Sequence, residues 1–556
     1  HQLILISRHV GLFHLSTSSH SAKFQDRLEV RHILVRAAWS LSTKMFKHCL
    51  FSRDFILFIF TGCLLYICTE LLETTRDIKS SLRTAIASEN SRDLSKLATL
   101  RESALFTALA VADAGEKEQL ERIVMRIPNL PLNYMLDSKP VKYTKSIKCS
   151  KYPTLYDIQF NNIYWQVLHT TNGTFYLYSA FFDNRPASPE KPSVRILAMV
   201  DRVTPAVTTR CQLWYEGEKE PIVSKISEYK YIWVKSYGNY KNGILQPYLL
   251  QCIVPKDFNK RVPLSVSLVE DRCDPPKNNL RVINNLPGEG GKENFAVCVK
   301  GISGSQDNSL KMVEWLELMF LLGAHKVFLY DMGTHSNMSK IFQYYESQGK
   351  VDVRSLTLPG DQPNDSDLLD IYLKHKVINK RQNEVIPYND CLYRNMNRYK
   401  FIVLLDTDEI IMPRTSQNWK ILMEKIAPQV MSGSGHPRSS YVARHVYFLN
   451  SMQEEHGWVA DVPRYMYFLQ HVYRAFNYTG PGSYVKCFHD PQRILALHNH
   501  FPISCLEGGC SHENMPTELV HLQHYRSGCK PELRKSVPLI LKHTSPRRLH
   551  PRYRNL

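Results

Sequence analysis

Short apolar runs alternate with longer helix-forming stretches between residues 295 and 405. The runs with strand character are FAVCV, KVFLY, VDVRSL and FIVLL, which begin at residues 295, 326, 351 and 401. The segments between them have the apolar pattern of helices: MVEWLELMFLLG, MSKIFQYYESQG and a stretch around 382–398. This alternation predicts a parallel α/β sheet with right-handed crossovers, in which ligands bind beyond the carboxyl ends of the strands. We therefore expect a binding site where these strands end.

The chain before residue 290 has a different pattern of apolar residues. Seven short runs rich in β-branched and aromatic residues fall between residues 163 and 270, which predicts a smaller β-rich domain over 150–290. The segment NNLPGEGGKEN is a natural linker, and the α/β domain is expected over 291–526. Residues 73–149, which are rich in Leu, Ala, Glu, Lys and Arg, predict a helical stem.

One long apolar segment lies near the N-terminus, at residues 55–72. Basic residues precede it and glutamates lie at its end, so we expect a single transmembrane anchor with residues 1–54 as a cytosolic tail. A cleaved signal peptide is the alternative, but no small-residue cleavage site follows the run. The first methionine is Met45, so residues 1–44 are expected to precede the true start or to form a longer tail.

The formal net charge of +18 is concentrated at the two ends of the chain. Residues 1–44 hold six Lys and Arg against two Asp and Glu, and residues 526–556 hold nine against one. No basic stripe interleaved with aromatic residues marks the middle, so nucleic acid is not expected as a partner. The basic tail, residues 527–556, is expected to be a solvated terminus.

Ten cysteines follow the apolar segment, and most are too scattered to form metal-binding pairs. Their even number predicts disulfides in an oxidising compartment, without indicating which residues pair. Four glycosylation sequons fall on the same side of the anchor, at Asn172, Asn337, Asn364 and Asn477. The cluster HNHFPISCLEGGCSH, residues 498–512, leaves a zinc site open, although a disulfide within it is favoured. These features together predict a membrane protein of the secretory pathway.

The strand FIVLL runs directly into Asp406, Thr407, Asp408 and Glu409. Burying like charges together is costly without a partner, and residues i and i+2 at the end of a strand point to the same side. Asp406 and Asp408 therefore predict a site for Mn²⁺ or Mg²⁺, which would neutralise charge on a departing diphosphate.

Other readings of the acidic motif fit the sequence less well. An EF-hand would need Gly at position 411 and Glu at position 417, where Ile411 and Gln417 stand. A phosphatase of the haloacid dehalogenase type would need Thr or Val where Ile410 stands. Neither a phosphate loop nor a kinase motif accompanies the acids. Solvated acids that merely end a strand are the simplest alternative.

The wider sequence resembles glycosyltransferase family 92, formerly called domain of unknown function 23. The similarity covers roughly residues 155–526 and lies, in chain order, in YLYSAFFDNRP, VRILAMV, FAVCVKG, VEWLELMFLLGAHKVFLYDMG, QNEVIPYNDCLYRNMNRYKFIVLLDTDEIIMP, PQRILALHNH and HLQHYR. The resemblance implies a type II Golgi enzyme with a metal-dependent GT-A nucleotide-sugar fold. It also implies inverting β-1,4-galactosyl transfer from UDP-galactose to galactose or fucose.

The resemblance implies particular metal ligands. Asp406 and Asp408 would bind the metal and the donor diphosphate. GT-A enzymes commonly add a C-terminal histidine as a ligand. His498 in ALHNH matches that residue, and His500 and His524 compete for the role.

Four residues besides the motif are expected at the donor: Lys300, Asp331, Asp390 and Arg394. Lys300 and Asp331 leave the first two strands of the sheet, where GT-A folds hold uridine and ribose. Asp390 and Arg394 are spaced i, i+4 on the helix before FIVLL, and a surface ion pair is the alternative there.

Inversion at the sugar carbon requires a carboxylate that takes the proton of the acceptor hydroxyl. The sequence does not identify this base. Glu454, Glu455 and Asp461 follow the motif in an expected acceptor loop, and each also fits as a solvated acid.

The expected protein is therefore a single-pass type II Golgi glycosyltransferase. Its GT-A-type α/β domain, with a mixed or parallel central sheet, follows the anchor, the stem and the β-rich domain. It would transfer galactose from UDP-galactose to a glycoprotein glycan with Mn²⁺ or Mg²⁺ as cofactor. A different sugar donor on the same fold, or a non-catalytic lectin-like glycan-binding protein, are the alternatives.

Overall fold

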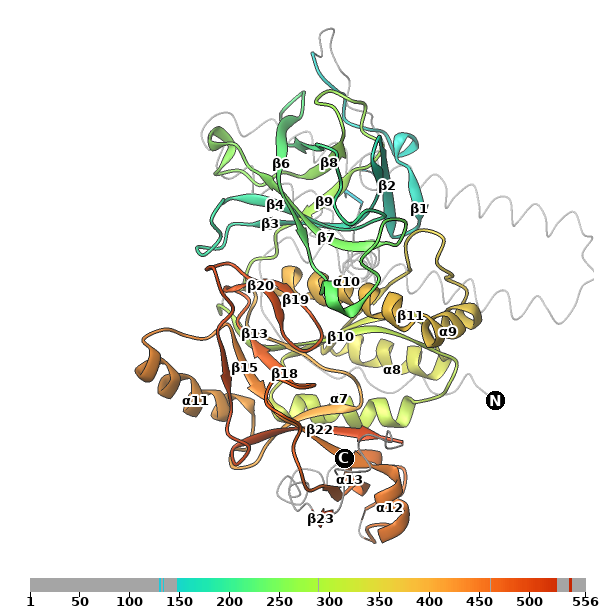
Figure 1. Ribbon diagram of the computed structural model, residues 1–556, viewed down its shortest axis with the longest axis vertical. Helices are drawn as coiled ribbons and strands as arrows, with labels where there is room; N and C mark the ends of the chain where they lie inside the picture. The colour runs from blue at the N-terminus through green and yellow to red at the C-terminus, as the bar shows by residue number, and fades with distance from the viewer. Residues whose placement is uncertain are drawn as a thin grey trace, which may run out of the picture. The chain divides into compact units, whose positions relative to one another are not determined.

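The computed structural model describes residues 130, 131, 134, 148–288, 290–460, 462–527 and 540–542 (Figure 1). The expected cytosolic tail and anchor, most of the stem and most of the basic tail lie outside these residues. Within the described ranges, no helix combines the length and the apolar character that crossing a membrane requires.

The first part of the described chain is a β-barrel with two added strands. Its strands pair in the order β1-β2-β3-β4-β7-β6-β5-β8-β9, and β3 also pairs with β9, so the seven strands from β3 to β9 close on themselves. The strands are β1 (Phe160–Asn162), β2 (Trp165–Thr170), β3 (Gly173–Asp183), β4 (Ser193–Val200), β5 (Arg210–Trp214), β6 (Ile222–Tyr231), β7 (Gln246–Ile253), β8 (Ser265–Val269) and β9 (Leu280–Ile283). Short 3-10 turns are η1 (Leu155–Asp157), η2 (Lys235–Tyr237) and η3 (Lys256–Phe258).

The two faces of the barrel strands belong to different cores. On β4, Ile196 and Ala198 pack in the barrel interior with Phe175. Leu197 and Met199, which alternate with them, pack in a second cluster that also contains residues of the α/β part. The barrel and the α/β part therefore share a continuous hydrophobic core.

The second part is built on a seven-stranded sheet in the order β12-β11-β10-β13-β18-β15-β21. The first four strands run parallel, as expected, whereas β18 is antiparallel to both β13 and β15. The expected α/β fold is thus confirmed, and the central sheet is mixed. The strands are β10 (Glu293–Gly304), β11 (Lys326–Thr334), β12 (Val351–Ser355), β13 (Tyr399–Leu404), β15 (Ser440–Ala443), β18 (Lys486–His489) and β21 (His512–Asn514).

Helices cover both faces of this sheet. Phe295 and Val297 of β10 pack in the cluster that holds α7, α8 and α11, whereas Ala296 and Cys298 face α10. Figure 1 shows α10 between the barrel and the central sheet. The helices are α7 (Ser309–Leu322), α8 (Ser336–Ser347), α9 (Ser366–His375), α10 (Val377–Asn395), α11 (Trp419–Ser434), α12 (Asn450–His456) and α13 (Tyr467–Gln470).

A smaller three-stranded sheet adjoins the end of β13. It has the order β14-β22-β16, with β14 (Glu409–Pro413), β22 (Val520–Arg526) and β16 (His445–Leu449). Two strand pairs complete the described fold: β17 (Tyr473–Ala475) with β23 (Ile540–Lys542), and β19 (Ile494–Leu497) with β20 (Pro502–Cys505).

Disulfides are present, as expected. Four cystines are formed: Cys149–Cys273, Cys211–Cys252, Cys298–Cys391 and Cys505–Cys510. Because Cys505 and Cys510 bond to each other, the alternative of a zinc site in residues 498–512 is wrong. Cys487 is a buried free thiol, and Cys529 lies outside the described residues.

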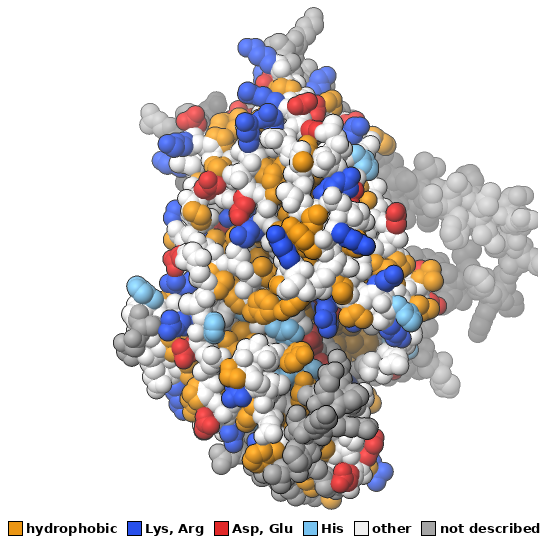
Figure 2. All heavy atoms as spheres, viewed as in Figure 1, with side chains coloured by type: hydrophobic (Ala, Val, Ile, Leu, Met, Phe, Trp, Pro, Cys, Tyr) orange, Lys and Arg blue, Asp and Glu red, His pale blue; other side chains and the backbone are white. Residues whose placement is uncertain are grey.

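Charged side chains are mixed on the face shown in Figure 2. Lys and Arg are dispersed among Asp and Glu there, over both the barrel and the α/β part. This dispersion agrees with the sequence, in which the two chain ends carry most of the excess positive charge.

Candidate functional site

The acidic motif lies where three strands meet. β13 ends at Leu404, the chain turns, and β14 begins at Glu409. The antiparallel pairing of β14 with β22 sets Glu409 opposite His524, and β16, which begins at His445, pairs with the other edge of β22. The carboxylates at the carboxyl end of β13 therefore meet histidines from two strands that are distant in sequence.

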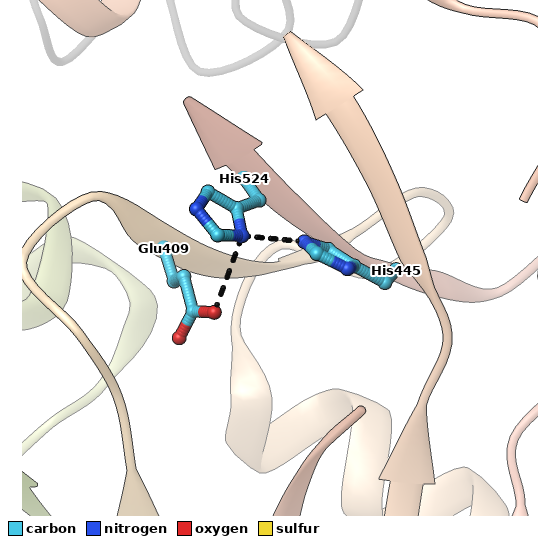
Figure 3. A group of neighbouring side chains, drawn as sticks. All are labelled: Glu409, His445 and His524. Atoms are coloured by element: carbon cyan, nitrogen blue, oxygen red, sulfur yellow. Dashed lines mark hydrogen bonds and ion pairs between the residues drawn. The ribbon is translucent and has the colours of Figure 1, made fainter. Parts of the chain in front are cut away.

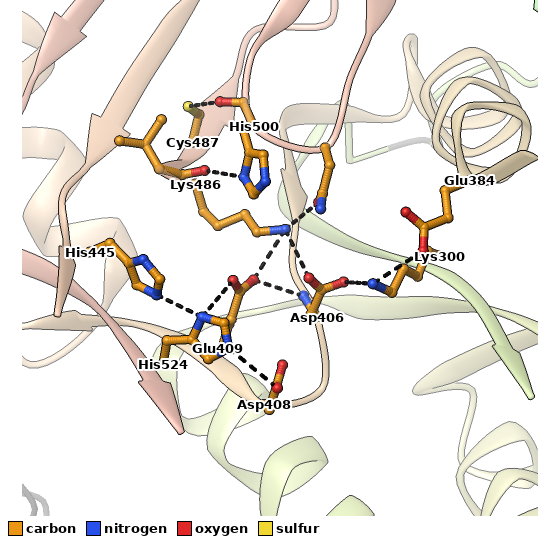
Figure 4. Close-up of polar contacts among 12 residues, drawn as sticks. Lys300, Glu384, Asp406, Asp408, Glu409, His445, Lys486, Cys487, His500 and His524 are labelled. Atoms are coloured by element: carbon orange, nitrogen blue, oxygen red, sulfur yellow. Dashed lines mark hydrogen bonds and ion pairs between the residues drawn. The ribbon is translucent and has the colours of Figure 1, made fainter. Parts of the chain in front are cut away.

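Asp406 is held by two lysines from neighbouring strands. Its carboxylate oxygens lie 3.1 Å from Lys300 Nζ and 3.4 Å from Lys486 Nζ (Figure 4). Lys300 also pairs with Glu384 at 3.3 Å. Burial alone would raise the pKa of the Asp406 carboxyl, but the two ammonium groups lower it. The negative charge of Asp406 is therefore balanced by two ammonium groups of the protein.

Lys486 is the buried centre of this network, and sequence reasoning missed it. It is fully buried on β18, 3.1 Å from Glu409 Oε2, and it donates a hydrogen bond to the side-chain oxygen of Asn499. Burial would lower the pKa of its amine, but Asp406 and Glu409 raise it. The signal that could have found it is a lone lysine in the otherwise buried run VKCFH.

Asp408 and His524 form a separate, more open pair. Nε2 of His524 lies 3.4 Å from Oδ2 of Asp408, whose side chain is 36% exposed, against 16% for Asp406. Burial would raise the pKa of the Asp408 carboxyl, but its hydrogen bond to His524 and the imidazole's charge lower it. Asp408 also lines a cavity of about 650 Å³. It is thus the carboxylate of the motif that faces a space in which a ligand could lie.

The other nitrogen of His524 faces the protein interior (Figure 3). Nδ1 lies 2.7 Å from Nε2 of His445 and 3.4 Å from Oε1 of Glu409, and the three ligand atoms lie within 4.8 Å of one another. A separation of 2.7 Å between ring nitrogens is a hydrogen bond, and Glu409 is already paired with Lys486. Burial lowers the pKa of His445 to about 2, so its ring is neutral. We therefore interpret His445 and Glu409 as hydrogen-bonded support for His524.

The pair Asp408–His524 has the chemistry of an open cation site. Ligand atoms about 2.1 Å from an octahedral ion lie roughly 3 Å apart, close to the observed 3.4 Å. The ion-paired cluster also contains four carboxylates, from Glu384, Asp406, Asp408 and Glu409, against two ammonium groups. A carboxylate oxygen and an imidazole nitrogen at this spacing are both metal-ligand atoms, so Asp408 and His524 fit a divalent ion.

His498 lies elsewhere, which removes the geometric basis for its expected role as a metal ligand. Its ring lies 4.8 Å from Phe501, 5.6 Å from Trp233 and 5.7 Å from Tyr237, measured between centroids. Within the described residues, no contact joins His498 to Asp406 or Asp408. Burial lowers its pKa to about 4, as expected for a neutral ring in a core. Of the three histidines considered, His524 is the one that contacts the motif.

The expected donor residues fall in different environments. Lys300 lies at the motif, whereas Asp331 accepts hydrogen bonds from the backbone of Gly333 and Thr334 at 3.0 Å and so shapes the end of β11. Asp390 and Arg394 do form the expected i, i+4 pair, at 2.6 Å. Both are buried, so the alternative of a surface ion pair is wrong.

The buried pair belongs to the shared core. Asp390 also accepts a hydrogen bond of 2.7 Å from Tyr330, and burial of its carboxyl is outweighed by Arg394, so its pKa is lowered. Among the base candidates, Glu454 and Glu455 are exposed on α12, and Asp461 lies outside the described residues.

Fold and site together define a mixed α/β protein with an acidic, histidine-flanked site at the carboxyl end of a central strand. Residues 293–551 match the family model described as Glycosyltransferase family 92. This part of the chain is thus a glycosyltransferase family 92 domain, and the family expected from the sequence motifs is confirmed.

One curated relative is the "Beta-1,4-galactosyltransferase galt-1" of Caenorhabditis elegans. It is 24% identical over 248 residues, which cover 43% of this chain. The match spans about half the length of that relative, 51%.

Similar solved structures include S. aureus TarS 1-349 alone, in complex with UDP and in complex with UDP-GlcNAc. They are 14–15% identical, cover 31% of this chain and 38–39% of theirs, and have TM-scores of 0.17, 0.17 and 0.18. At TM-scores this low, nothing is inferred from these structures.

Proposed function

We propose that this protein is a metal-dependent, inverting glycosyltransferase with a GT-A-type fold. It transfers galactose from UDP-galactose to a terminal galactose or fucose of a glycoprotein glycan, in β-1,4 linkage. The observation that carries the proposal is the open pair of Asp408 and His524 beside a cavity, inside a glycosyltransferase family 92 domain. The name of the relative from Caenorhabditis elegans supports the galactosyl donor and the linkage.

Each side chain of the motif has a distinct part in this proposal. Asp408 and His524 hold Mn²⁺ or Mg²⁺, which supplies Lewis-acid stabilisation of the leaving diphosphate when it is bound. Asp406 keeps Lys300 beside the donor, and Lys300, whose side chain is 26% exposed, is open to contact with the diphosphate. Asp331, at the end of β11, contacts the ribose of the donor in this proposal. The acceptor oxygen displaces the diphosphate from the sugar carbon while a carboxylate takes its proton.

The setting we propose is the Golgi lumen, with the N-terminal apolar segment as a single-pass type II anchor. Four disulfides are consistent with folding in an oxidising compartment. The sequons at Asn172, Asn337, Asn364 and Asn477 are consistent with the same location.

The test is turnover by the purified full-length chain. We expect release of UDP from UDP-galactose in the presence of Mn²⁺ and a galactose- or fucose-terminated acceptor, and a product heavier by one hexose in mass spectrometry. EDTA should stop the reaction and added Mn²⁺ should restore it. If the protein turns over only a different nucleotide sugar, that nucleotide sugar is the donor and the assignment of UDP-galactose is wrong. Glycan binding that resists EDTA, without turnover of any nucleotide sugar, would favour the lectin-like alternative.

A further inference from the structure

The cavity beside Asp408 is built from segments that are far apart in sequence. Its walls come from the start of α7, the start of α12, the stretch leading into α13 and the end of β22. At about 650 Å³ it has the volume of a small-molecule site and is large enough for one or two sugar rings. Because Asp408 forms part of the wall, a ligand in the cavity lies next to the carboxylate of the open pair.

One aromatic residue of the wall is held fixed. The ring of Tyr467 has Nζ of Lys311 4.2 Å from its centroid and the ring of His471 at 4.3 Å. Its hydroxyl donates a hydrogen bond of 2.8 Å to Oδ1 of Asn450. Tyr467 therefore supports the wall, since these contacts occupy its ring and its hydroxyl.

Tyr465, two residues earlier, is different. It lines the same cavity, and the residue is 62% exposed. A large exposed aromatic residue on the wall of a polar cavity is a platform for a ligand with an apolar face. Hexoses have such a face, formed by their axial C–H groups, and carry hydroxyls at the rim that suit polar neighbours such as Asn450.

Resting on the proposed function, we propose that this cavity binds the acceptor sugar, with Tyr465 as the ring against which its apolar face packs. Two cations of the wall already contact aromatic rings. Lys311 lies over the ring of Tyr467 and is desolvated, which lowers the pKa of its amine. The guanidinium of Arg526 lies 6.0 Å from the ring centroid of Tyr447. The sugar hydroxyl that reacts would lie on the Asp408 side of the cavity.

The experiment compares steady-state kinetics of the full-length protein and three variants. The acceptor is whichever of methyl β-galactoside and methyl α-fucoside the wild-type protein uses. Tyr465→Ala should raise the acceptor KM about tenfold and leave kcat and the KM for UDP-galactose within twofold. Tyr465→Phe should behave like wild type, because the ring is kept. The matched control is Tyr344→Ala, at a tyrosine that is 61% exposed on α8 and does not line the cavity.

Each other outcome has a defined meaning. A raised KM for UDP-galactose with an unchanged acceptor KM would make the cavity a donor site and overturn the proposal. An unchanged acceptor KM in Tyr465→Ala, with active wild-type protein, would overturn this inference and leave the proposed function standing. Wild-type protein that transfers galactose to no acceptor at all, including the two methyl glycosides, would overturn both this inference and the proposed function.

Discussion

His524 contacts Asp408 through one ring nitrogen and the protein interior through the other. Nε2 lies 3.4 Å from Oδ2 of Asp408, and Nδ1 lies 2.7 Å from Nε2 of His445. A histidine that binds a metal through one nitrogen commonly has the other fixed by a hydrogen bond, which sets both tautomer and ring orientation. The ring of His524 is therefore held in one orientation, which is the one that binding of the proposed cation through Nε2 would use.

Loss of either member of the open pair should remove the metal and the activity together. We expect Asp408→Asn and His524→Ala each to weaken Mn²⁺ binding at least tenfold and to lower kcat at least 100-fold, without unfolding the protein, because both residues are partly exposed. Electron paramagnetic resonance of free Mn²⁺ in the presence of UDP measures the binding. His498→Gln is the comparator and should keep wild-type affinity. Metal binding lost in His498→Gln but retained in His524→Ala would contradict this assignment.

His445 should act through the orientation of His524. If the proposed metal bound Nε2 of His524, Nδ1 would carry the proton and donate a hydrogen bond to Nε2 of His445. Removing this acceptor in His445→Ala should weaken Mn²⁺ affinity by about 10- to 100-fold. His445→Gln, whose side-chain oxygen can accept the same bond, should recover much of the loss. If the two variants bind Mn²⁺ equally well, His445 has no positioning role.

Lys486 should matter most for stability. It is fully buried between Asp406 and Glu409, so Lys486→Met leaves two buried carboxylates without their common counter-charge. Removing one partner of a buried ion pair typically costs about 3–5 kcal/mol. Lys300→Met should cost less, because the Lys300 side chain is 26% exposed and water can partly replace it. Urea unfolding followed by tryptophan fluorescence measures both, and a Lys486→Met variant as stable as wild type would refute this role.

Much of the fold could be predicted because its signals are local. Each of the seven apolar runs expected to be strands before residue 270 contains a strand, and the alternation after residue 295 gives the expected parallel strands and helices. The antiparallel strand β18 and its neighbour β15 were not predicted. β18 pairs with β13 from far along the chain, β15 pairs with β18, and no helix in the sequence pattern indicates either strand.

The site was only partly predictable, because part of it also depends on the pairing of strands that are far apart in sequence. Asp406 and Asp408 follow a strand, and that is visible in the sequence. The choice between His498 and His524 depends on the register of β14 with β22, which sets Glu409 opposite His524 and has no local signal. Likewise, the i, i+4 spacing of Asp390 and Arg394 indicates an ion pair but not that it is buried. Burial depends on the barrel that packs over α10.

Glu314 on α7 should make stability depend on pH. The residue is 7% exposed, and burial raises its pKa from 4.5 to about 7, although its carboxylate accepts hydrogen bonds of 2.9 Å from the backbone N–H groups of Phe468 and Leu469. The folded protein thus binds this proton more tightly than the unfolded chain does. The stabilisation is fully present below pH 4.5 and is lost as pH rises through about 7.

The expected loss over that range is on the order of 3 kcal/mol, since one pKa unit corresponds to about 1.4 kcal/mol. Glu314→Gln, which cannot ionise and still accepts one of the two bonds, should show a flatter dependence of unfolding free energy on pH between 4.5 and 7.5. Glu424→Gln, at an exposed glutamate of α11, is the matched control and should keep the wild-type decline. An equally steep decline in Glu314→Gln would assign the pH dependence to other groups, because this variant has lost the only proton that Glu314 can exchange.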